Sequence, residues 1–258
     1  MTVAERDLVD AIESSLFLLP PPPGVAQDLA VPGIRGRITK VSHPIANLAG
    51  DARFSELEVD AKIAKVRERY GNLAFGWVTG PSTRPVDLPQ RLVASGFRPI
   101  ASLAGMVLTD LAKPIAANAD VREIPFAEAL AGSEWMGRAY GMPTDVTRTF
   151  NEMIAAGSAS LKIRGYFAYL AGEQPVAWSY LMYLPDSAVV LLGGAATLPE
   201  HRGRGLYSAL VAKRLADARA DGRTTAIIQA DRDTSAPICE KLGFREVCAL
   251  EMYASPAA

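Results

Sequence analysis

The sequence predicts an α+β protein of two related modules, each a mixed, mostly antiparallel sheet flanked by helices. Three observations predict this fold class. The chain has 258 residues and is 49% hydrophobic, enough for two domains with their own cores. Strand-like and helical runs alternate in both halves, and "SGFRPI" at 95–100 has a counterpart, "LGFREV", at 242–247. We therefore expect modules over residues 1–115 and 121–258, joined through the small, proline-interrupted stretch 112–120.

The elements of the first module follow from the spacing of its apolar residues. A short acidic helix opens the chain and stops at the four prolines Pro20–Pro23. The "GIRGR" run at 33–37 is expected to be a turn, because strand-like residues follow it and no helix does. The later elements are a helix over 55–70, a strand over 73–80, a short helix over 87–97 and a pair of strands over 97–111.

The second module shows the same kinds of signal more clearly. A strand at 121–124 precedes a helix over 126–141, and a second helix is expected to begin near Pro143. Three strands follow, and the turn residues Gly172–Glu173 and Pro185–Ser187 between them make neighbouring strands antiparallel. The last elements are a long helix from Leu206 to Gly222, a buried strand at 224–230, a short helix that Ser235 caps and a strand at 244–254.

The stretch "LPEHRGRGLYSALVAKRL" at 198–215 places two glycines among arginines directly before an amphipathic helix. The first amide N–H groups of a helix have no partner within it, and the helix dipole adds partial positive charge there. Glycine lets an anion approach those amides, and Arg202 and Arg204 can add charge-assisted hydrogen bonds. The arrangement favours a diphosphate group. The alternative is a solvent-facing turn with glycines for the backbone angles and arginines for solubility.

Two known phosphate loops fit this stretch less well. A P-loop requires lysine and then serine or threonine after its second glycine, and the chain has no such sequence. A dinucleotide fingerprint is matched by Gly203 and Gly205, with Ser208 in place of the third glycine and Asp231 after the next strand. In a dinucleotide-binding fold the glycine loop follows a strand of a parallel sheet almost directly. Here "LPEHR" separates the glycines from the preceding strand, and the preceding strands are predicted to be antiparallel.

The third phosphate loop belongs to the GNAT superfamily of acyl-CoA-dependent N-acetyltransferases, which residues 121–255 resemble throughout. Its signature R/Q-x-x-G-x-G/A is matched by residues 202–207, except that Tyr207 takes the final small-residue place, and "CEKLGFREV" follows in the expected order. The resemblance implies that the amides of 203–208 hold the diphosphate of acetyl-CoA, while a strand edge pairs with its pantetheine arm. The implied binding residues are Ala195, Ala196, Thr197, Arg202, Gly203, Arg204, Gly205, Leu206, Tyr207 and Ser208.

Two further features of the resemblance concern glycines. Gly193–Gly194, just before the implied pantetheine-binding strand edge, mark either a bulge or close packing against a helix. The first module has no such loop before its helix 55–70, where "HPIANLAGDARFSEL" stands instead. It therefore resembles a degenerate GNAT copy with a structural role.

The resemblance also implies a mechanism, in which an amine attacks the thioester directly while a base takes its proton and an acid protonates the departing thiolate. That acid is commonly a tyrosine four residues before the glycine of the "LGF" motif, a position held here by Cys239. Two interpretations of Cys239 remain open. Its thiol, with an ordinary pKa of about 8.5, can protonate a departing thiolate of similar basicity, or Cys239 is a small buried residue on a helix. Glu200, and the further acids Glu134, Asp145 and Asp233, are candidates for the base, and none is assigned.

Composition limits the partners and the cofactors. Lysine plus arginine number 27 against 28 acids, a net charge of −1, which gives no general attraction for nucleic acid or an anionic membrane. No apolar run approaches the roughly 20 residues that span a bilayer. Two histidines and two cysteines favour neither a metal site nor a disulfide framework, so we expect a cytoplasmic protein without a metal.

The function that these observations predict is an acetyl-CoA-dependent N-acetyltransferase acting on the amine of a small molecule. The alternative is a non-catalytic acyl-CoA-binding or regulatory protein, which the cysteine in place of the usual tyrosine favours. A more distant possibility is an oxidoreductase with a nucleotide cofactor. The sequence specifies neither the acceptor amine nor the oligomeric state.

Overall fold

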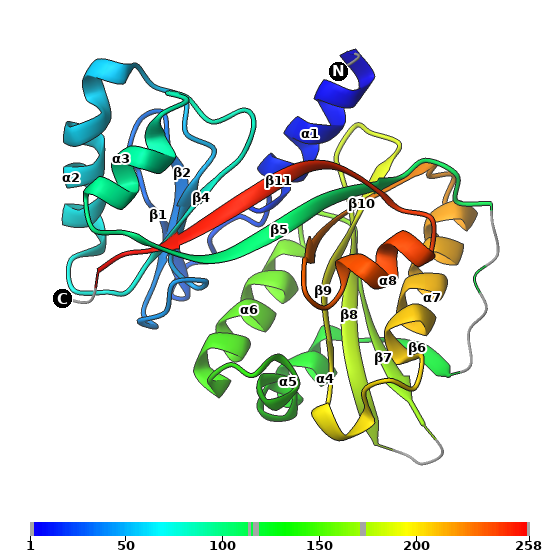
Figure 1. The fold of residues 1–258 in the computed structure, drawn as a ribbon. Helices are drawn as coiled ribbons and strands as arrows, with labels where there is room; N and C mark the ends of the chain where they lie inside the picture. The colour runs from blue at the N-terminus through cyan, green and yellow to red at the C-terminus, as the bar shows by residue number, and fades with distance from the viewer. Residues whose placement is uncertain (1–2, 113–114, 116–118, 171–173, 257–258) are drawn as a thin grey trace. The chain divides into compact units, whose positions relative to one another are not determined.

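The computed structural model describes residues 3–112, 115, 119–170 and 174–256 (Figure 1). Its contacts divide the chain into two compact units. The first comprises Met1–Gly105, Gln229–Thr234 and Glu246–Ala258, and the second comprises Met106–Ile228 and Ser235–Arg245. Residues from the end of the sequence thus group with its first half. The predicted turn Gly172–Glu173 and most of the predicted linker lie outside the described residues.

The first unit builds a mixed sheet with the strand order β1-β2-β3-β4-β11-β5. Strands β3 and β4 are parallel because helix α2 connects them, whereas β1–β2, β2–β3 and β4–β11 are antiparallel. Its elements are α1 Val3–Ser15, β1 Ala26–Asp28, β2 Arg35–Thr39, β3 Leu48–Gly50, η1 Glu56–Glu58, α2 Val59–Tyr70, β4 Gly76–Thr79, α3 Leu88–Ala94, most of β5 Arg98–Leu108 and most of β11 Arg245–Ala254.

The core of the first unit forms around aromatic rings. Phe97 meets both Phe75 and Trp77 edge to face, and Tyr70 stacks on Phe75 with ring centroids 4.2 Å apart. Leucine, isoleucine and valine side chains from α2, α3 and the sheet enclose this cluster. The apolar spacing of residues 55–70 therefore serves to bury one face of α2 against the sheet.

The second unit contains a sheet with the strand order β10-β9-β8-β7-β6. Strands β6 to β9 are antiparallel, and β10 is parallel to β9 because α7 connects them. Helix α7 packs on one face and α4–α6 lie along the other, as Figure 1 shows. Its elements are β6 Asp120–Ile124, α4 Phe126–Ala131, α5 Ser133–Tyr140, α6 Thr144–Gly157, β7 Ile163–Tyr169, β8 Pro175–Tyr183, β9 Val189–Thr197, η2 Pro199–His201, α7 Leu206–Ala220, β10 Thr225–Asp231 and α8 Ala236–Lys241.

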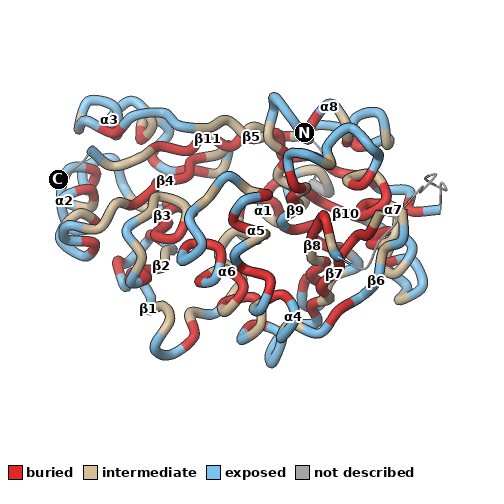
Figure 2. Tube along the Cα trace, turned by 90° about the horizontal axis from the view of Figure 1, so that it is seen from below, coloured by how far each residue is buried: buried red, intermediate tan, exposed pale blue. Residues whose placement is uncertain are grey.

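The two halves of the sequence repeat one series of elements. In each half, a strand, a long helix and a parallel strand are followed by a short helix and a long strand: β3-α2-β4-α3-β5 in the first half and β9-α7-β10-α8-β11 in the second. Burial follows this plan in Figure 2, where the buried stretches lie mainly along strands and the inward faces of helices. The predicted fold class, an α+β arrangement of mixed sheets flanked by helices, is confirmed.

Several local predictions differ from the structure. The expected pair of strands over 97–111 is a single strand, β5, that runs through Gly105. A Cβ on Gly105 would come within 2.3 Å of Cys248 Sγ, so this glycine permits close packing and does not form a turn. The expected helix over 126–141 breaks at Gly132, where a Cβ would meet the Trp135 indole at 2.6 Å. Ser235 precedes α8 without a capping hydrogen bond, and the "GIRGR" run enters strand β2.

The buried carboxyl of Glu13 makes the stability of the first unit depend on pH. Glu13 on α1 is 7% exposed and accepts hydrogen bonds from the Ser82 amide at 3.2 and 3.3 Å. Burial raises the pKa of this carboxyl above its ordinary value of 4.5. The folded state therefore favours the protonated acid, and the stability that this preference contributes is lost as pH rises through the raised pKa.

We accordingly expect Glu13→Gln to gain stability relative to the wild type as pH increases. Urea unfolding of both proteins between pH 4 and pH 8 would measure the difference in their free energies of unfolding. The difference should move in favour of the variant with rising pH. A difference that stays constant over this range would show that Glu13 does not titrate with folding.

Candidate functional site

Strand β9 is paired with β10 along only part of its length. The parallel register joins Thr225, Ala226 and Ile227 to Val189, Val190 and Leu191, and the recorded pairing ends there. On its other side β9 remains paired with β8 as far as Thr197. Backbone groups of β9 beyond Leu191 therefore have no recorded pairing with β10, and an extended ligand can hydrogen-bond to such groups. The predicted residues Ala195, Ala196 and Thr197 all lie in this part of the strand.

A β-bulge begins this part of β9. Ser179 pairs with Ala195 and Tyr180 with Gly193, which leaves Gly194 as the extra residue, at φ +34°. A Cβ on Gly193 would lie 2.1 Å from the Tyr180 ring, and one on Gly194 would lie 2.7 Å from the Tyr140 hydroxyl on α5. Both interpretations of the glycine pair are therefore correct, because the bulge is also a point of close packing.

The glycine loop between η2 and α7 has backbone angles that require glycine, as the interpretation of this stretch as a turn predicts. Gly203 and Gly205 adopt φ of +73° and +75°, values that favour glycine. Apart from the glycine and its two neighbours in the chain, no described residue has an atom within 4 Å of the position where a Cβ would stand on either residue. These glycines therefore serve the backbone conformation and leave open space beside the start of α7.

Helix α7 begins without a capping side chain and without an acidic residue in its first turn. Its first amides, those of Leu206, Tyr207 and Ser208, thus lack partners within the helix, and the helix dipole makes this end electropositive. Arg204 is exposed and forms no hydrogen bond or ion pair with the part of the chain that the structure describes. These groups fit the diphosphate of acetyl-CoA.

The side chain of Arg202 makes hydrogen bonds within the chain. Its Nε donates to the Thr197 carbonyl at 3.2 Å and its Nη2 donates to the Ala139 carbonyl at 3.0 Å. The side chain thus ties the loop to the end of β9 and to α5. A sequence pattern cannot separate this arginine from Arg204, because both flank the same glycine.

The equivalent helix of the first unit begins differently. Before α2, the Ser55 amide and hydroxyl both donate to the Glu58 carboxylate, at 3.0 and 2.9 Å. These hydrogen bonds lower the pKa of Glu58, so the carboxylate stays ionised at neutral pH. The chain's own anion occupies the region where a helix start could bind a ligand's anion, consistent with the predicted degenerate copy.

Cys239, the predicted candidate for the acid, is fully buried on α8, and its Sγ lies 3.4 Å from the hydroxyl of Tyr207. Burial raises the pKa of the Cys239 thiol, while the hydrogen bond with Tyr207 and the charge of Arg214 lower it. The side chain of Tyr207 therefore points toward α8. The sequence could not show this direction.

Arg214 is the residue that sequence reasoning missed. Its side chain is 0% exposed, although arginine is rarely fully buried in proteins. Its Nη1 donates to the carbonyls of Tyr180 at 3.1 Å and Gly193 at 3.2 Å, while its Nη2 has no partner among the described residues. Burial lowers the pKa of this guanidinium. The only sign of this role in the sequence is that Arg214 lies among leucine and alanine on the apolar face of the predicted helix.

The candidate bases do not gather around the bulge. Glu200 pairs with Arg138 at 3.0 Å on the surface, and a hydrogen bond from its own backbone lowers its pKa, which makes it a weak base. Asp145 accepts a hydrogen bond from the Val146 amide at the start of α6. Glu134 is exposed on α5, and Asp233 belongs to the residues of the first unit. No base is assigned from this arrangement.

Aromatic residues line the face of the sheet under α5. Trp178 is 1% exposed and meets Phe167 edge to face, as Trp135 does, so it belongs to the core. Tyr180 and Tyr140 are only partly buried and meet at the bulge. Burial raises the pKa of Tyr140, which therefore stays protonated at neutral pH.

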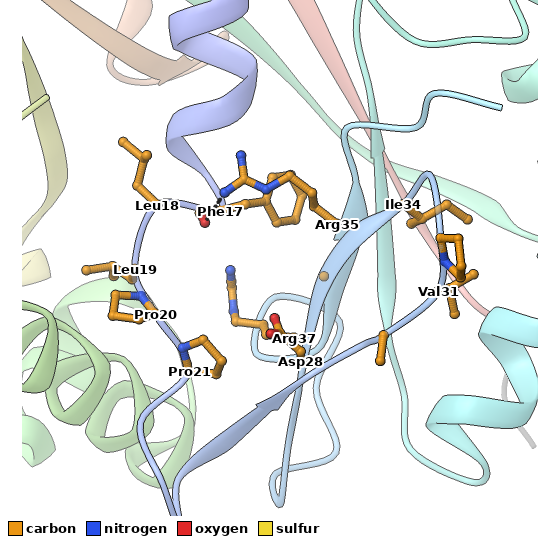
Figure 3. A pocket seen from close by; sticks show the side chains of 13 residues that line it. Phe17, Leu18, Leu19, Pro20, Pro21, Asp28, Val31, Ile34, Arg35 and Arg37 are labelled. Carbon is orange, nitrogen blue, oxygen red and sulfur yellow. Dashed lines mark hydrogen bonds between the residues drawn. The ribbon is translucent and has the colours of Figure 1, made fainter. Parts of the chain in front are cut away.

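A separate hollow of about 660 Å³ lies in the first unit, between the segment Phe17–Pro21 and strand β2 (Figure 3). Arg35 and Arg37 project toward it, and both are engaged with the chain. Arg37 donates to the carbonyls of Leu16, Ile45 and Ala46, and Arg35 donates to the Phe17 carbonyl and pairs with Asp51 at 3.7 Å. These contacts brace the proline-rich segment against the sheet.

Two searches cover only the residues that the structure describes. Within them, no three histidine, cysteine, aspartate or glutamate side chains form a group that could hold a metal ion. Within the same residues, no helix combines the length and the apolar character needed to cross a membrane.

Comparison with known proteins identifies the fold. Residues 184–247, which contain β9, the glycine loop, α7, β10 and α8, match the family described as an acetyltransferase (GNAT) domain. No curated protein matches the chain in sequence. Among solved structures, a GCN5-related N-acetyltransferase from Kribbella flavida is 17% identical with a TM-score of 0.67, over 100% of this chain and 97% of that one.

Two more structures agree. A tandem GNAT protein from the clavulanic acid biosynthesis pathway is 16% identical with a TM-score of 0.59, over 100% of this chain and 97% of that one. A GCN5-related N-acetyltransferase from Sphaerobacter thermophilus is 14% identical with a TM-score of 0.63, over 88% and 78%. The chain therefore has the fold of the GNAT acetyltransferases, as its glycine loop predicts.

Proposed function

We propose that the protein is an acetyl-CoA-dependent N-acetyltransferase that transfers the acetyl group to the amine of a small molecule. The observation that carries the proposal is the uncapped start of α7, with Gly203 and Gly205 at positive φ, next to the part of β9 beyond its recorded pairing with β10. These two features suit the two parts of an acyl-CoA: an anionic diphosphate and an extended pantetheine arm. The match of residues 184–247 to a GNAT domain covers both features.

The binding roles follow from the contacts of each residue. The amides of 203–208 and the exposed guanidinium of Arg204 would hold the diphosphate. Backbone groups of Ala195, Ala196 and Thr197 would hold the pantetheine arm, and Arg202 fixes the loop that joins these two sets. Bound acetyl-CoA supplies the activated acetyl group. The bulge at Gly194 turns backbone groups out of the sheet ladder, where an N–H can stabilise the negative charge of an attacked carbonyl.

A small, uncharged or weakly charged amine is the acceptor that the site favours. Tyr140 and Tyr180 present partly buried rings and hydroxyls beside the bulge, which suits an amine with an apolar portion. The net charge of −1 gives no long-range attraction for a polyanion or a strongly basic protein segment.

Thiol release from acetyl-CoA, followed over a set of amino acids, polyamines, arylamines and amino sugars, tests the proposed function. Mass spectrometry of the acceptor should show the added acetyl group on nitrogen. Calorimetric binding of acetyl-CoA without acyl transfer to any amine would support a non-catalytic acyl-CoA-binding or regulatory protein. Binding of NAD(P) in place of acetyl-CoA would support an oxidoreductase.

A further inference from the structure

The side chain of Tyr207 links the glycine loop to helix α8. It starts from the second residue of α7, and its hydroxyl lies 3.4 Å from Sγ of Cys239. A hydrogen bond with Ser235, just before α8, holds the same hydroxyl. Tyr207 is half-buried whereas Cys239 is fully buried, so the phenol lies on the outer side of this hydroxyl–thiol pair.

Arg214 connects the pair to the bulge in β9. It lies seven positions after Tyr207, two helical turns along the same face of α7. One end of its guanidinium donates to the Tyr180 and Gly193 carbonyls at the bulge. After burial itself, the strongest influences on its pKa are the charges of Tyr207 and then Cys239. A buried cation that has no acidic partner among the residues that the structure describes thus lies between the bulge and the two proton-bearing side chains.

Acyl transfer from a thioester needs groups of these kinds. As the carbon–sulfur bond breaks, negative charge develops on sulfur, and a nearby O–H or S–H group can neutralise it by giving up a proton. A fixed cation close to that donor stabilises the anion that the donor becomes. Tyr207 and Cys239 are the two possible proton donors. The phenol of Tyr207 is the more exposed of the two, and it belongs to the first turn of α7, whose amides are proposed to bind the diphosphate.

We propose that the hydroxyl of Tyr207 is the proton donor to the departing thiol, that Cys239 positions it, and that Arg214 stabilises the resulting phenolate. This inference rests on the proposed acetyltransferase function. The amine nitrogen bonds to the acyl carbon, the carbon–sulfur bond breaks, and sulfur receives the Tyr207 proton. The amine gives its own proton to solvent, and the phenolate regains one from solvent, so that the protein ends the cycle unchanged.

The protonation states agree with this assignment of roles. Burial raises the pKa of Tyr207 and the pKa of Cys239, so both carry their protons at neutral pH. The charge of Arg214 lowers both values and limits the rise. The phenol therefore remains available as a donor throughout the neutral range.

Tyr207→Phe tests the inference because it removes only the hydroxyl. We expect kcat with acetyl-CoA to fall by about 100-fold or more, which is the usual contribution of a positioned acid. Affinity for CoA, measured by calorimetry, should change less than about threefold. With an acetyl aryl thioester, whose thiolate needs no proton to depart, the same variant should lose much less activity. If Tyr207 had only a structural role, the variant would lose activity equally with acetyl-CoA and with the aryl thioester.

Two further variants provide the controls. Tyr183→Phe removes another tyrosine hydroxyl that bonds to the far end of α7, through Asp221, and should leave kcat within about threefold. Cys239→Ala should cost less than about tenfold if Cys239 only positions the phenol. In the protein without CoA, Tyr207→Phe should shift the alkylation of Cys239 to higher pH, because the Tyr207 hydrogen bond lowers the pKa of that thiol.

The outcomes distinguish this inference from the proposed function. If the wild type acetylates an amine and Tyr207→Phe retains kcat, the inference is wrong and the function stands. If Cys239→Ala shows the larger loss and the aryl thioester rescues it, Cys239 is the donor instead. If the wild type binds acetyl-CoA but turns over no donor, both the function and the inference are wrong.

Discussion

Gly205→Asp is expected to weaken the binding of acetyl-CoA by about 100-fold or more while leaving the protein folded. A carboxylate at this position would accept hydrogen bonds from the first amides of α7 and compete with the diphosphate for them. Losing two hydrogen bonds to a charged group, at about 1.5 kcal/mol each, corresponds to about a 100-fold change in Kd. Repulsion between the carboxylate and the diphosphate adds to the loss.

The folded protein should tolerate this change. Aspartate is among the non-glycine residues found most often at positive φ, and it is a favourable residue at a helix start. Apart from Gly205 and its two neighbours in the chain, no described residue has an atom within 4 Å of the Cβ position on Gly205. Gly205→Asn is the matched control, because asparagine has the same shape and tolerance of positive φ without the charge. Calorimetric titration of both variants should show Asn weakening the affinity far less than Asp, and equal affinities would contradict the diphosphate assignment.

Gly193→Ala is expected to destabilise the protein by about 1–3 kcal/mol, the usual cost of overpacking a filled interior. The added Cβ would lie 2.1 Å from two ring atoms of Tyr180 and 2.5 Å from its hydroxyl. The ring cannot move freely, because Tyr180 lies on strand β8, which is paired with β9. The backbone carbonyl of Tyr180 also accepts a hydrogen bond from Arg214. Urea unfolding at constant pH would measure the loss.

Gly203→Ala is the control for Gly193→Ala. Gly203 has φ of +73° and open space around its Cβ position, so alanine there should cost about 1 kcal/mol from backbone strain alone. In a Tyr180→Ala background the cost of Gly193→Ala should fall by about 1 kcal/mol or more, because the clash is gone. Equal costs in both backgrounds would show that Tyr180 does not explain the requirement for glycine.

The features predicted correctly from the sequence are those that depend on short stretches of chain. The start of α7, the positive φ of Gly203 and Gly205, and the end of α2 at Gly71 each follow from glycine next to a helical run. The features that were missed depend on partners distant in sequence. The single strand β5 depends on the close packing of Gly105 against Cys248, and the role of Arg214 depends on the carbonyls of β8 and β9 that accept its hydrogen bonds.

In the candidate site, too, the features that depend on a short stretch of chain could be predicted and those that depend on distant residues could not. The open start of α7 could be predicted because the glycines and the helical run that define it are adjacent in the sequence. The direction of Tyr207 could not be predicted, because its contact partner Cys239 is 32 positions away in the sequence. A sequence shows that the usual tyrosine is missing from position 239, but only the structure shows another phenol next to that position.

A crystal structure of the protein with acetyl-CoA tests the central claim most directly. The diphosphate should lie against the amides of residues 203–208 with Arg204 turned toward it, and the pantetheine arm should run along β9 between Gly193 and Thr197. The Tyr207 hydroxyl should lie within hydrogen-bond distance of the sulfur. A diphosphate bound elsewhere, such as the Arg35–Arg37 hollow of the first unit, or a Tyr207 ring lying over the amides at the start of α7, would contradict the account.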